Sequence, residues 1–206
     1  MIEKIYEDKD ILVCIKPAGT LSERSEAKNS LPRMLTEESG EVLFTLHRLD
    51  REVTGLIVYA KNERAAAFLS REIAEGRMEK VYLAMTEGRL SEKSGTLVDL
   101  LFKDSAKNKS YVVKRERRGV KRASLEYTEL SSGERGTLYR IKLHTGRTHQ
   151  IRVQLSSRAC PIIGDRKYGA SAGGEVLLCS HRLEFTHPAT KKQMSFEYTP
   201  EFARME

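Results

Sequence analysis

Short apolar runs separated by turn residues dominate the chain and predict a protein built mainly from β-strands. Residues 11–15 form one such run, which ends at a Pro-Ala-Gly turn, and residues 56–60 and 81–85 are similar. Further strands are expected, from alternating or continuous apolar character, at 111–114, 123–130, 137–143, 151–155, 176–179, 182–186 and 193–198.

Helical periodicity is confined to a few segments. Apolar residues recur at near-helical spacing within 62–75, where Asn62 can cap the helix and Gly76 can end it. A second helix can start at Ser30, because serine is a good cap and the nearby Pro32 is tolerated in a first turn. Many strands with few helices predict an α+β domain around a large sheet.

Length and charge narrow the class of protein. The 206 residues fit a single domain over 1–206, and Lys and Arg outnumber Asp and Glu by 36 to 29, which favours an anionic partner such as nucleic acid. Three widely separated cysteines argue against a disulfide framework or zinc ribbon and favour a reducing cytoplasm. The charged N-terminus and the lack of a long apolar run predict neither secretion nor a membrane span.

One segment, 103–122, is unusually basic. Two interpretations of it are open, a solvated hairpin or loop and an arm that contacts RNA. Its basic residues are Lys103, Lys107, Lys109, Lys114, Arg115, Arg117, Arg118, Lys121 and Arg122.

A dense polar cluster at 46–55 precedes the apolar run at 56–60 and contains Asp50 between Arg48 and Arg51. Nearby cations favour the ionised form of a carboxylate, so Asp50 is suited to act as a nucleophile or base. Taken alone, however, an aspartate in this setting is more often a turn or salt-bridge residue.

A second cluster at 144–152 packs hydrogen-bond donors around one glycine, as a polyanion site requires. Arginine can clamp a carboxylate with two hydrogen bonds, so Arg147 or Arg152 could hold Asp50. A surface turn for Arg147 and a structural role for His149 are the alternatives.

Ordered motifs identify a family that the chain resembles. HRLD at 47–50 with a following TG, KxY at 80–82 and TGRTHQIR at 145–152 stand in the order typical of RluA-family pseudouridine synthases. Segments 11–19, 164–169 and 183–188 also look like that family, so the resemblance spans nearly the whole chain. It implies the pseudouridine synthase fold, a large mostly antiparallel mixed sheet with a central active-site cleft and flanking helices and loops. Many members carry a small N-terminal RNA-binding domain, and none is expected here, because the resemblance begins almost at residue 1.

The resemblance also implies residue roles. Asp50 matches the essential carboxylate, and Arg48 matches the residue that helps to displace and hold the target nucleotide. Tyr82 matches the tyrosine that stacks on the target base, and Arg152 matches the basic partner of the aspartate. Further RNA contacts are expected from His47, Arg147, His149, Lys109, Arg115, Arg117 and Arg118. The chain departs from the family pattern at Val53 and at 179–182.

The implied reaction is the isomerisation of one or more specific uridines to pseudouridine in structured ribosomal or transfer RNA, without cofactor or metal. The enzyme is expected to be a cytoplasmic monomer. Bond cleavage builds oxocarbenium-like charge that an ionised carboxylate can stabilise. Attack at C1′, addition to C6 and loss of the C2′ proton all remain open.

Two alternatives have different consequences. A catalytically silent RNA-binding or assembly protein of the same fold would share the basic charge but would not need Asp50, Tyr82 and Arg152 together. A metal-dependent nuclease is disfavoured because the histidines lack paired acidic ligands at compact spacing. Those histidines are His47, His144, His149, His181 and His187.

Overall fold

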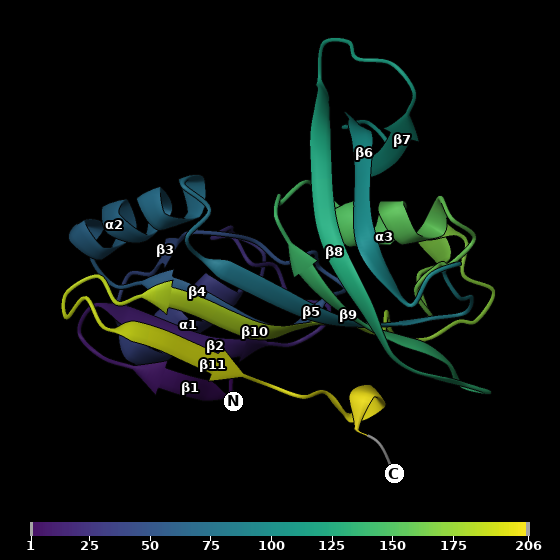
Figure 1. Ribbon diagram of the computed structural model, residues 1–206. Coiled ribbons are helices and arrows are strands. Elements are labelled where there is room, and N and C mark those ends of the chain that lie inside the picture. The colour runs from purple at the N-terminus through teal and green to yellow at the C-terminus, as the bar shows by residue number, and fades with distance from the viewer. Residues whose placement is uncertain (1, 205–206) are drawn as a thin grey trace. The chain divides into compact units, whose positions relative to one another are not determined.

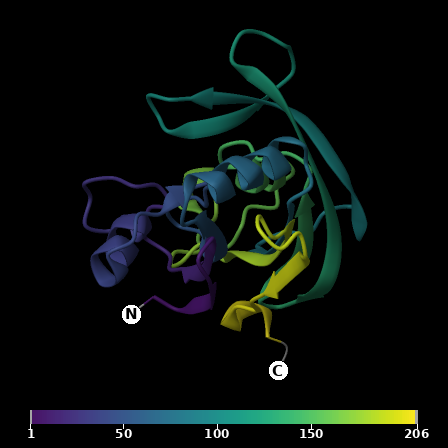
Figure 2. The same ribbon diagram turned by 90° about the vertical axis from the view of Figure 1, so that its left-hand side faces the viewer.

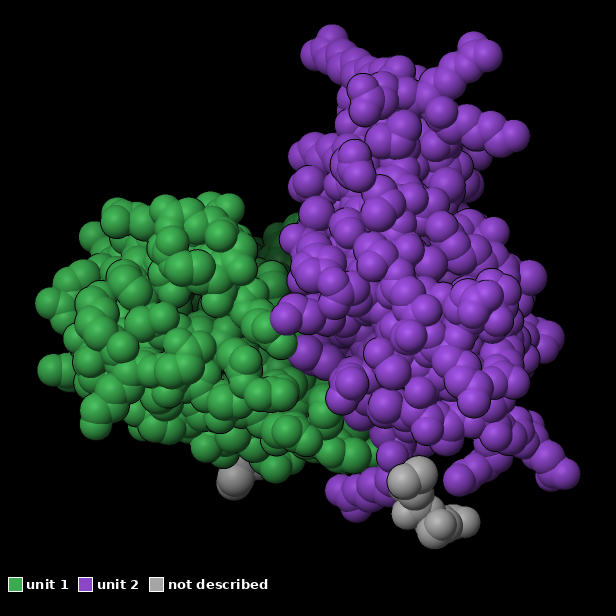
Figure 3. All heavy atoms as spheres, in the orientation of Figure 1, with its two compact units in different colours: residues 1–80, 179–200 green, residues 81–178, 201–206 purple. Residues whose placement is uncertain are grey.

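The computed structural model describes residues 2–204, which divide into two compact units. Unit 1 comprises residues 1–80 and 179–200, and unit 2 comprises 81–178 and 201–206 (Figure 3). Within the described residues there are eleven strands and three α-helices (Figure 1), which confirms the α+β class. No helix in this part of the chain has the length and apolar character needed to cross a membrane.

Unit 1 is a mixed sheet with two helices. Its strands are β1 (Lys4–Glu7), β2 (Ile11–Lys16), β3 (Phe44–Thr45), β4 (Thr54–Ala60), β10 (Leu178–Thr186) and β11 (Gln193–Glu197). β4 and β10 pair in parallel, and the other pairs in this unit are antiparallel. The helices are α1 (Leu31–Ser39) and α2 (Glu63–Ala74).

The apolar runs of unit 1 form its core as the sequence pattern predicts. Ile11, Val13 and Val58 pack with Leu69 of α2 and Phe185 of β10, and all five are fully buried. The predicted cap of α2 is present, because the Asn62 side chain accepts the N–H of Ala65 at 2.9 Å. The predicted cap of α1 is only partly right. Ser30 does precede the helix, but its hydroxyl donates to the carbonyl of Glu23 and makes no cap hydrogen bond.

Unit 2 is an antiparallel sheet in the order β5-β9-β8-β6-β7. Its strands are β5 (Glu79–Thr86), β6 (Ser94–Asp104), β7 (Lys109–Val113), β8 (Val120–Gly133) and β9 (Gly136–Leu143). β6, β7 and β8 form a three-stranded ribbon, and the loop from β7 to β8 extends clear of the rest of the unit in both views (Figures 1 and 2). Half of the basic segment 103–122 is therefore paired strand, and the other half lies in the two connecting loops.

The predicted strand at 151–155 is wrong, since these residues lie in helix α3 (Gln150–Ser156). Apolar and polar residues alternate there, which resembles a half-buried strand, but all six residues from 150 to 155 are buried. The polar members are buried with partners. Arg152 pairs with Asp165, and Gln154 donates to Asp99 at 2.7 Å.

Further differences concern strands, and β1 and β3 were not predicted from the apolar pattern. The segments 176–179 and 182–186 belong largely to one continuous strand, β10. β6 was not predicted, because its apolar residues do not alternate with polar ones: Val98 and Leu101 lie on opposite faces, one exposed and one buried.

Gly55 lies at the start of β4 with a φ of 111°, a backbone conformation that favours glycine. A Cβ at this position would lie 2.7 Å from the backbone nitrogen of Ser180 and 2.8 Å from Sγ of Cys179, and would also clash with the Ser180 carbonyl. Gly55 thus permits the parallel approach of β4 and β10, where it pairs with Ser180.

We expect Gly55→Ala to lower the free energy of unfolding by about 2–5 kcal/mol, because left-handed strain and overpacking add. Gly133→Ala is the matched control, since a Cβ there meets nothing within 4 Å and the φ is not positive. Urea unfolding of the two variants measures the difference. Equal midpoints would show that the pairing of β4 with β10 does not depend on a glycine at position 55.

Candidate functional site

The turn that carries Asp50 is held from both sides by the segment 16–22. The backbone N–H of Val53 donates to the Asp50 carbonyl at 3.0 Å and closes the turn. On one side, the Ser22 hydroxyl donates to the carbonyl of Leu49 at 2.9 Å and accepts its N–H at 3.0 Å. On the other, the N–H of Gly19 donates to the carbonyl of Arg51 at 2.7 Å. Asp50 itself is half-buried within a fixed backbone.

Lys16 completes this arrangement with a fully buried ammonium group. Its Nζ donates to the carbonyls of Pro17 and Thr20 at 3.0 Å and of Arg51 at 3.2 Å. Burial lowers the pKa of Lys16 to about 8, and the Asp50 and Glu52 carboxylates oppose that shift. The ammonium therefore contributes positive potential at the Asp50 turn while fixing its backbone.

The other residues of the HRLD motif differ in exposure. Arg48 is exposed and forms an ion pair with Glu23. His47 is buried, and its Nε2 accepts the N–H of Val58 at 3.3 Å. Burial lowers the pKa of His47 to about 3, with a smaller contribution from Lys80. This histidine is therefore neutral and presents little surface to a ligand.

Tyr82 lies on β5 of unit 2 and is 6% exposed. Its register partner is Ile141 of β9, which is fully buried. The neighbouring Lys80, in unit 1, has its pKa lowered by burial. Placement on a paired central strand gives the tyrosine ring a rigid backbone.

Arg152 of α3 is 2% exposed and forms a two-point ion pair with Asp165. Nε donates to Oδ2 at 2.7 Å and Nη2 donates to Oδ1 at 2.9 Å. The guanidinium carbon also lies 5.3 Å from the centre of the Tyr168 ring. A planar fork held at two nitrogens has one orientation, so Asp165 fixes the direction of Arg152.

His149 and Tyr168 extend this network. The Tyr168 hydroxyl accepts the N–H of Ser110 at 2.8 Å and lies 2.9 Å from Nδ1 of His149. His149 is 7% exposed and has a φ of 53°, a conformation uncommon for residues other than glycine. The contacts support the structural alternative for His149.

Gln150 and Arg147 organise the loop before α3. The Gln150 carbonyl oxygen accepts the Thr145 hydroxyl at 2.7 Å and the backbone N–H of Arg147 at 3.0 Å, while its amide donates to Ser124. Arg147 is exposed, and its Nε donates to the carbonyl of Arg122 at 3.0 Å. The loop at 144–152 is thus attached to the basic strand β8.

Sequence reasoning assigned no role to Lys16, Asp165 or Gln150. The signals available in the sequence are the family-like segments 11–19 and 164–169, which contain Lys16 and Asp165, and the motif 145–152, which contains Gln150. The sequence does not show which charged residues are buried, nor which distant residue compensates each buried charge.

One group of side chains has the composition of a metal site. Ligand atoms of Asp8, Asp10 and His187 lie within 4.8 Å of one another. Oδ1 of Asp8 already accepts the N–H groups of Asp10 and Ile11, and its Oδ2 contacts His187 at 2.8 Å and accepts the Tyr6 hydroxyl.

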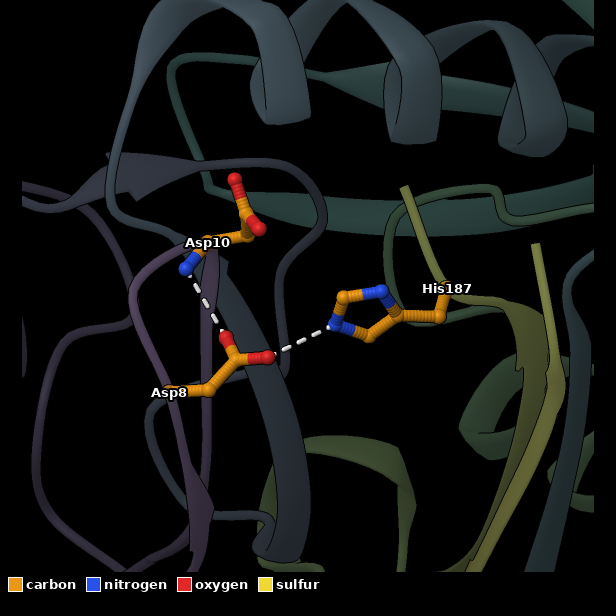
Figure 4. A group of neighbouring side chains, drawn as sticks. All are labelled: Asp8, Asp10 and His187. Carbon is orange, nitrogen blue, oxygen red and sulfur yellow. Dashed lines mark hydrogen bonds and ion pairs between the residues drawn. The ribbon is translucent and has the colours of Figure 1, made fainter. Parts of the chain in front are cut away.

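Both ring nitrogens of His187 also have hydrogen-bond partners. Its Nδ1 accepts the N–H groups of Ala189 and Thr190, so the proton is on Nε2, which faces Asp8. Figure 4 shows the Asp10 carboxylate turned away from both other side chains. The group is a hydrogen-bonded clasp between the β1–β2 turn and the turn after β10, and it does not suit a metal ion.

Comparisons with known proteins agree with the motifs. The family model described as RNA pseudouridylate synthase matches residues 10–157. A relative from Mycoplasma pneumoniae, an uncharacterised RNA pseudouridine synthase, is 32% identical over 95% of this chain, which spans 66% of that relative's length. The dual-specificity RNA pseudouridine synthase RluA of Yersinia pestis is 32% identical over 96% of this chain and 98% of its own.

A solved structure gives the same answer for the fold. The human RNA pseudouridylate synthase domain containing 4 protein superposes with a TM-score of 0.79 at 25% identity, covering 97% of this chain and 89% of that one. The family resemblance read from the motifs is confirmed: the chain belongs to the RNA pseudouridylate synthase family.

Proposed function

We propose that this protein isomerises one or more specific uridines to pseudouridine in structured ribosomal or transfer RNA. The family match carries the proposal, since residues 10–157 include Asp50, Tyr82 and Arg152. Two relatives support the substrate class by name. One is RluA of Yersinia pestis, called dual-specificity, and the other is ribosomal large subunit pseudouridine synthase D of Borreliella burgdorferi, 31% identical over 87% of this chain.

The reaction begins with removal of the target base from its stack, which costs a few kcal/mol in a duplex and less in a loop. We assign Arg48 to displacing and holding the target nucleotide, and its exposed side chain supports this. Tyr82 is assigned to stacking on the flipped base within the central cleft expected of the family.

Asp50 is the proposed catalytic carboxylate. The bonds from Ser22, Gly19 and Lys16 hold the backbone on both sides of it, so the backbone that carries the carboxylate is preorganised. An ionised carboxylate stabilises oxocarbenium-like charge on the ribose as the bond to N1 breaks. Reaction through C1′, C6 or the C2′ proton is compatible with this role.

Arg152 is the proposed partner of the catalytic carboxylate. The two-point pair with Asp165 supports this indirectly, because it sets the orientation of a guanidinium whose donors are spread over three nitrogens. Asp165 is accordingly a positioning residue in the proposal.

The remaining RNA contacts are assigned by exposure. Arg147, Arg115, Arg117 and Arg118 are exposed, and Lys109 is half-buried, so all five can meet phosphates. His47 and His149 are buried and hydrogen-bonded, so we assign them to supporting the site rather than to touching RNA. We also propose a cytoplasmic monomer. Cys14, Cys160 and Cys179 are buried and free, as a reducing compartment allows.

We expect Asp50→Asn to lower isomerisation by about 10³-fold or more while RNA binding survives, because the change removes charge and conserves shape. Tritium release from RNA labelled at uridine C5 measures the reaction. Glu63→Gln, which removes an exposed carboxylate in the same unit, serves as the control. Substantial turnover by Asp50→Asn would refute the assignment, and no release by the unmodified protein would favour the silent RNA-binding alternative.

Asp165→Asn is expected to lower the free energy of unfolding by about 3–5 kcal/mol, because it removes the negative partner of a buried guanidinium. Glu129→Gln is the matched control. Glu129 also makes a two-point pair, with Arg89, but the Arg89 side chain is 51% exposed, so a much smaller loss is expected. Denaturant midpoints compare them, and equal losses would contradict the special role of the Asp165 pair.

Treatment with a strong chelator should leave tritium release unchanged, because two members of the group nearest in composition to a metal site, Asp8 and His187, already have their ligand atoms hydrogen-bonded within the protein. In a parallel sample, metal is added back after chelation, which distinguishes loss of a required metal from inhibition by the chelator itself. A loss of activity that metal restores would overturn the metal-free proposal.

A further inference from the structure

The β6–β7–β8 ribbon has two different faces. Partners across an antiparallel pair lie on the same face of a sheet, and the register places Phe102 opposite both Tyr111 and Val120. Leu101 and Ala123 lie on the other face, where they pack with Val153 of α3. Phe102, Tyr111 and Val120 therefore form one row on the face turned away from α3, which we call the outer face.

The outer face carries apolar side chains that are half-buried or exposed. A second row across the ribbon contains Leu100 between Val113 and Arg122. Tyr111 is 37% exposed, and Val98, also on this face, is 45% exposed. Contiguous exposed apolar side chains on a sheet face commonly mark a binding surface.

Cations accompany the aromatic rings on this face. The guanidinium carbon of Arg117 lies 4.7 Å from the centre of the Phe102 ring. Nζ of Lys109 lies at the edge of the ribbon, 5.7 Å from the centre of the Tyr111 ring and 5.1 Å from that of Tyr168. Each ring thus has a positive group beside it, and an aromatic ring paired with a cation is the combination that proteins use to stack bases next to phosphates.

The charge of the ribbon is not neutralised within the described part of the chain. Segment 103–122 has nine basic residues and two acidic ones, and none of the nine forms an ion pair with an acidic side chain described in the structure. By contrast, Arg33, Arg48 and Arg77 elsewhere are all paired. Figure 3 shows long side chains radiating from the end of unit 2 where the β7–β8 loop lies.

This segment accounts for the entire net charge of the protein. The whole chain has 36 basic and 29 acidic residues, a net charge of +7. Removing nine basic and two acidic residues leaves 27 of each, so the other residues are balanced. A polyanion is therefore the partner that matches the ribbon in charge.

We propose that the outer face binds an unpaired stretch of RNA, with bases stacked on Tyr111 and Phe102 and phosphates held by Lys109, Arg117 and Arg122. A duplex hides the faces of its bases and offers only phosphate, sugar and groove edges, whereas a single strand exposes faces that can stack on aromatic rings. The inference rests on the proposed function only in taking RNA as the substrate.

The test compares Tyr111→Ala with Tyr111→Phe by fluorescence anisotropy, using labelled oligouridylate of about 12 nucleotides. Tyr111→Ala is expected to weaken binding about tenfold, because stacking on one ring is lost. Tyr111→Phe keeps the ring and should bind within about twofold of the unmodified protein. Leu130→Ala is the matched control, because Leu130 is an apolar residue on β8 that is 45% exposed and lies outside the ribbon's basic segment.

A duplex RNA of equal length separates stacking from charge. Its affinity should change less than about twofold in Tyr111→Ala, since phosphate contacts are retained. Unaltered oligouridylate binding by Tyr111→Ala overturns the proposal, and so does an equal loss for both RNAs. Melting temperatures show whether each variant is folded. Because binding is measured without turnover, an Asp50→Asn protein that still isomerises uridine would refute the catalytic assignment and leave this result intact.

Discussion

The buried ammonium of Lys16 is the interaction on which the Asp50 turn depends. Taking a charge out of water costs several kcal/mol unless its hydrogen bonds are replaced. Three carbonyls replace them, and two belong to the 17–20 turn while the third belongs to Arg51. The cost of burying the charge is offset only if both segments keep their positions. One lysine at the end of β2 thus connects this strand to the residues around the carboxylate.

Unit 2 also buries a cation but compensates its charge differently. Arg152 is the buried cation there, and its partner is the carboxylate of Asp165 rather than a set of carbonyls. Tyr168 connects this pair to Ser110 of β7 and to His149 at the start of α3. The basic ribbon and the helix that carries Arg152 therefore share one hydrogen-bonded support.

Much of the fold follows from local sequence, and the rest does not. The apolar runs at 11–15, 56–60 and 81–85 are strands in which every residue is buried, as a continuous apolar run predicts. The alternation of apolar and polar residues at 151–155 predicted a strand, but these residues form a helix. The alternation is uninformative there, because the polar side chains are also buried, beside partners distant in sequence. β6 was not predicted for the opposite reason, because its outer face exposes apolar residues.

The site residues also divide into those that local sequence motifs reveal and those that only the three-dimensional contacts reveal. Asp50, Tyr82 and Arg152 were reached through ordered motifs, whereas Lys16 and Asp165 act through contacts that sequence separation hides. Those contacts span 35 positions from Lys16 to Arg51 and 13 from Arg152 to Asp165.

The concentration of the net charge in one ribbon has a consequence for how RNA arrives. A protein with dispersed excess charge attracts a polyanion equally from many directions, whereas a balanced body with one positive arm is a strong electric dipole. The torque on that dipole turns the arm toward RNA at separations beyond contact, within about one Debye length of 8–10 Å at physiological salt. Encounters are therefore oriented before any base is touched, and raising the salt concentration would randomise the approach.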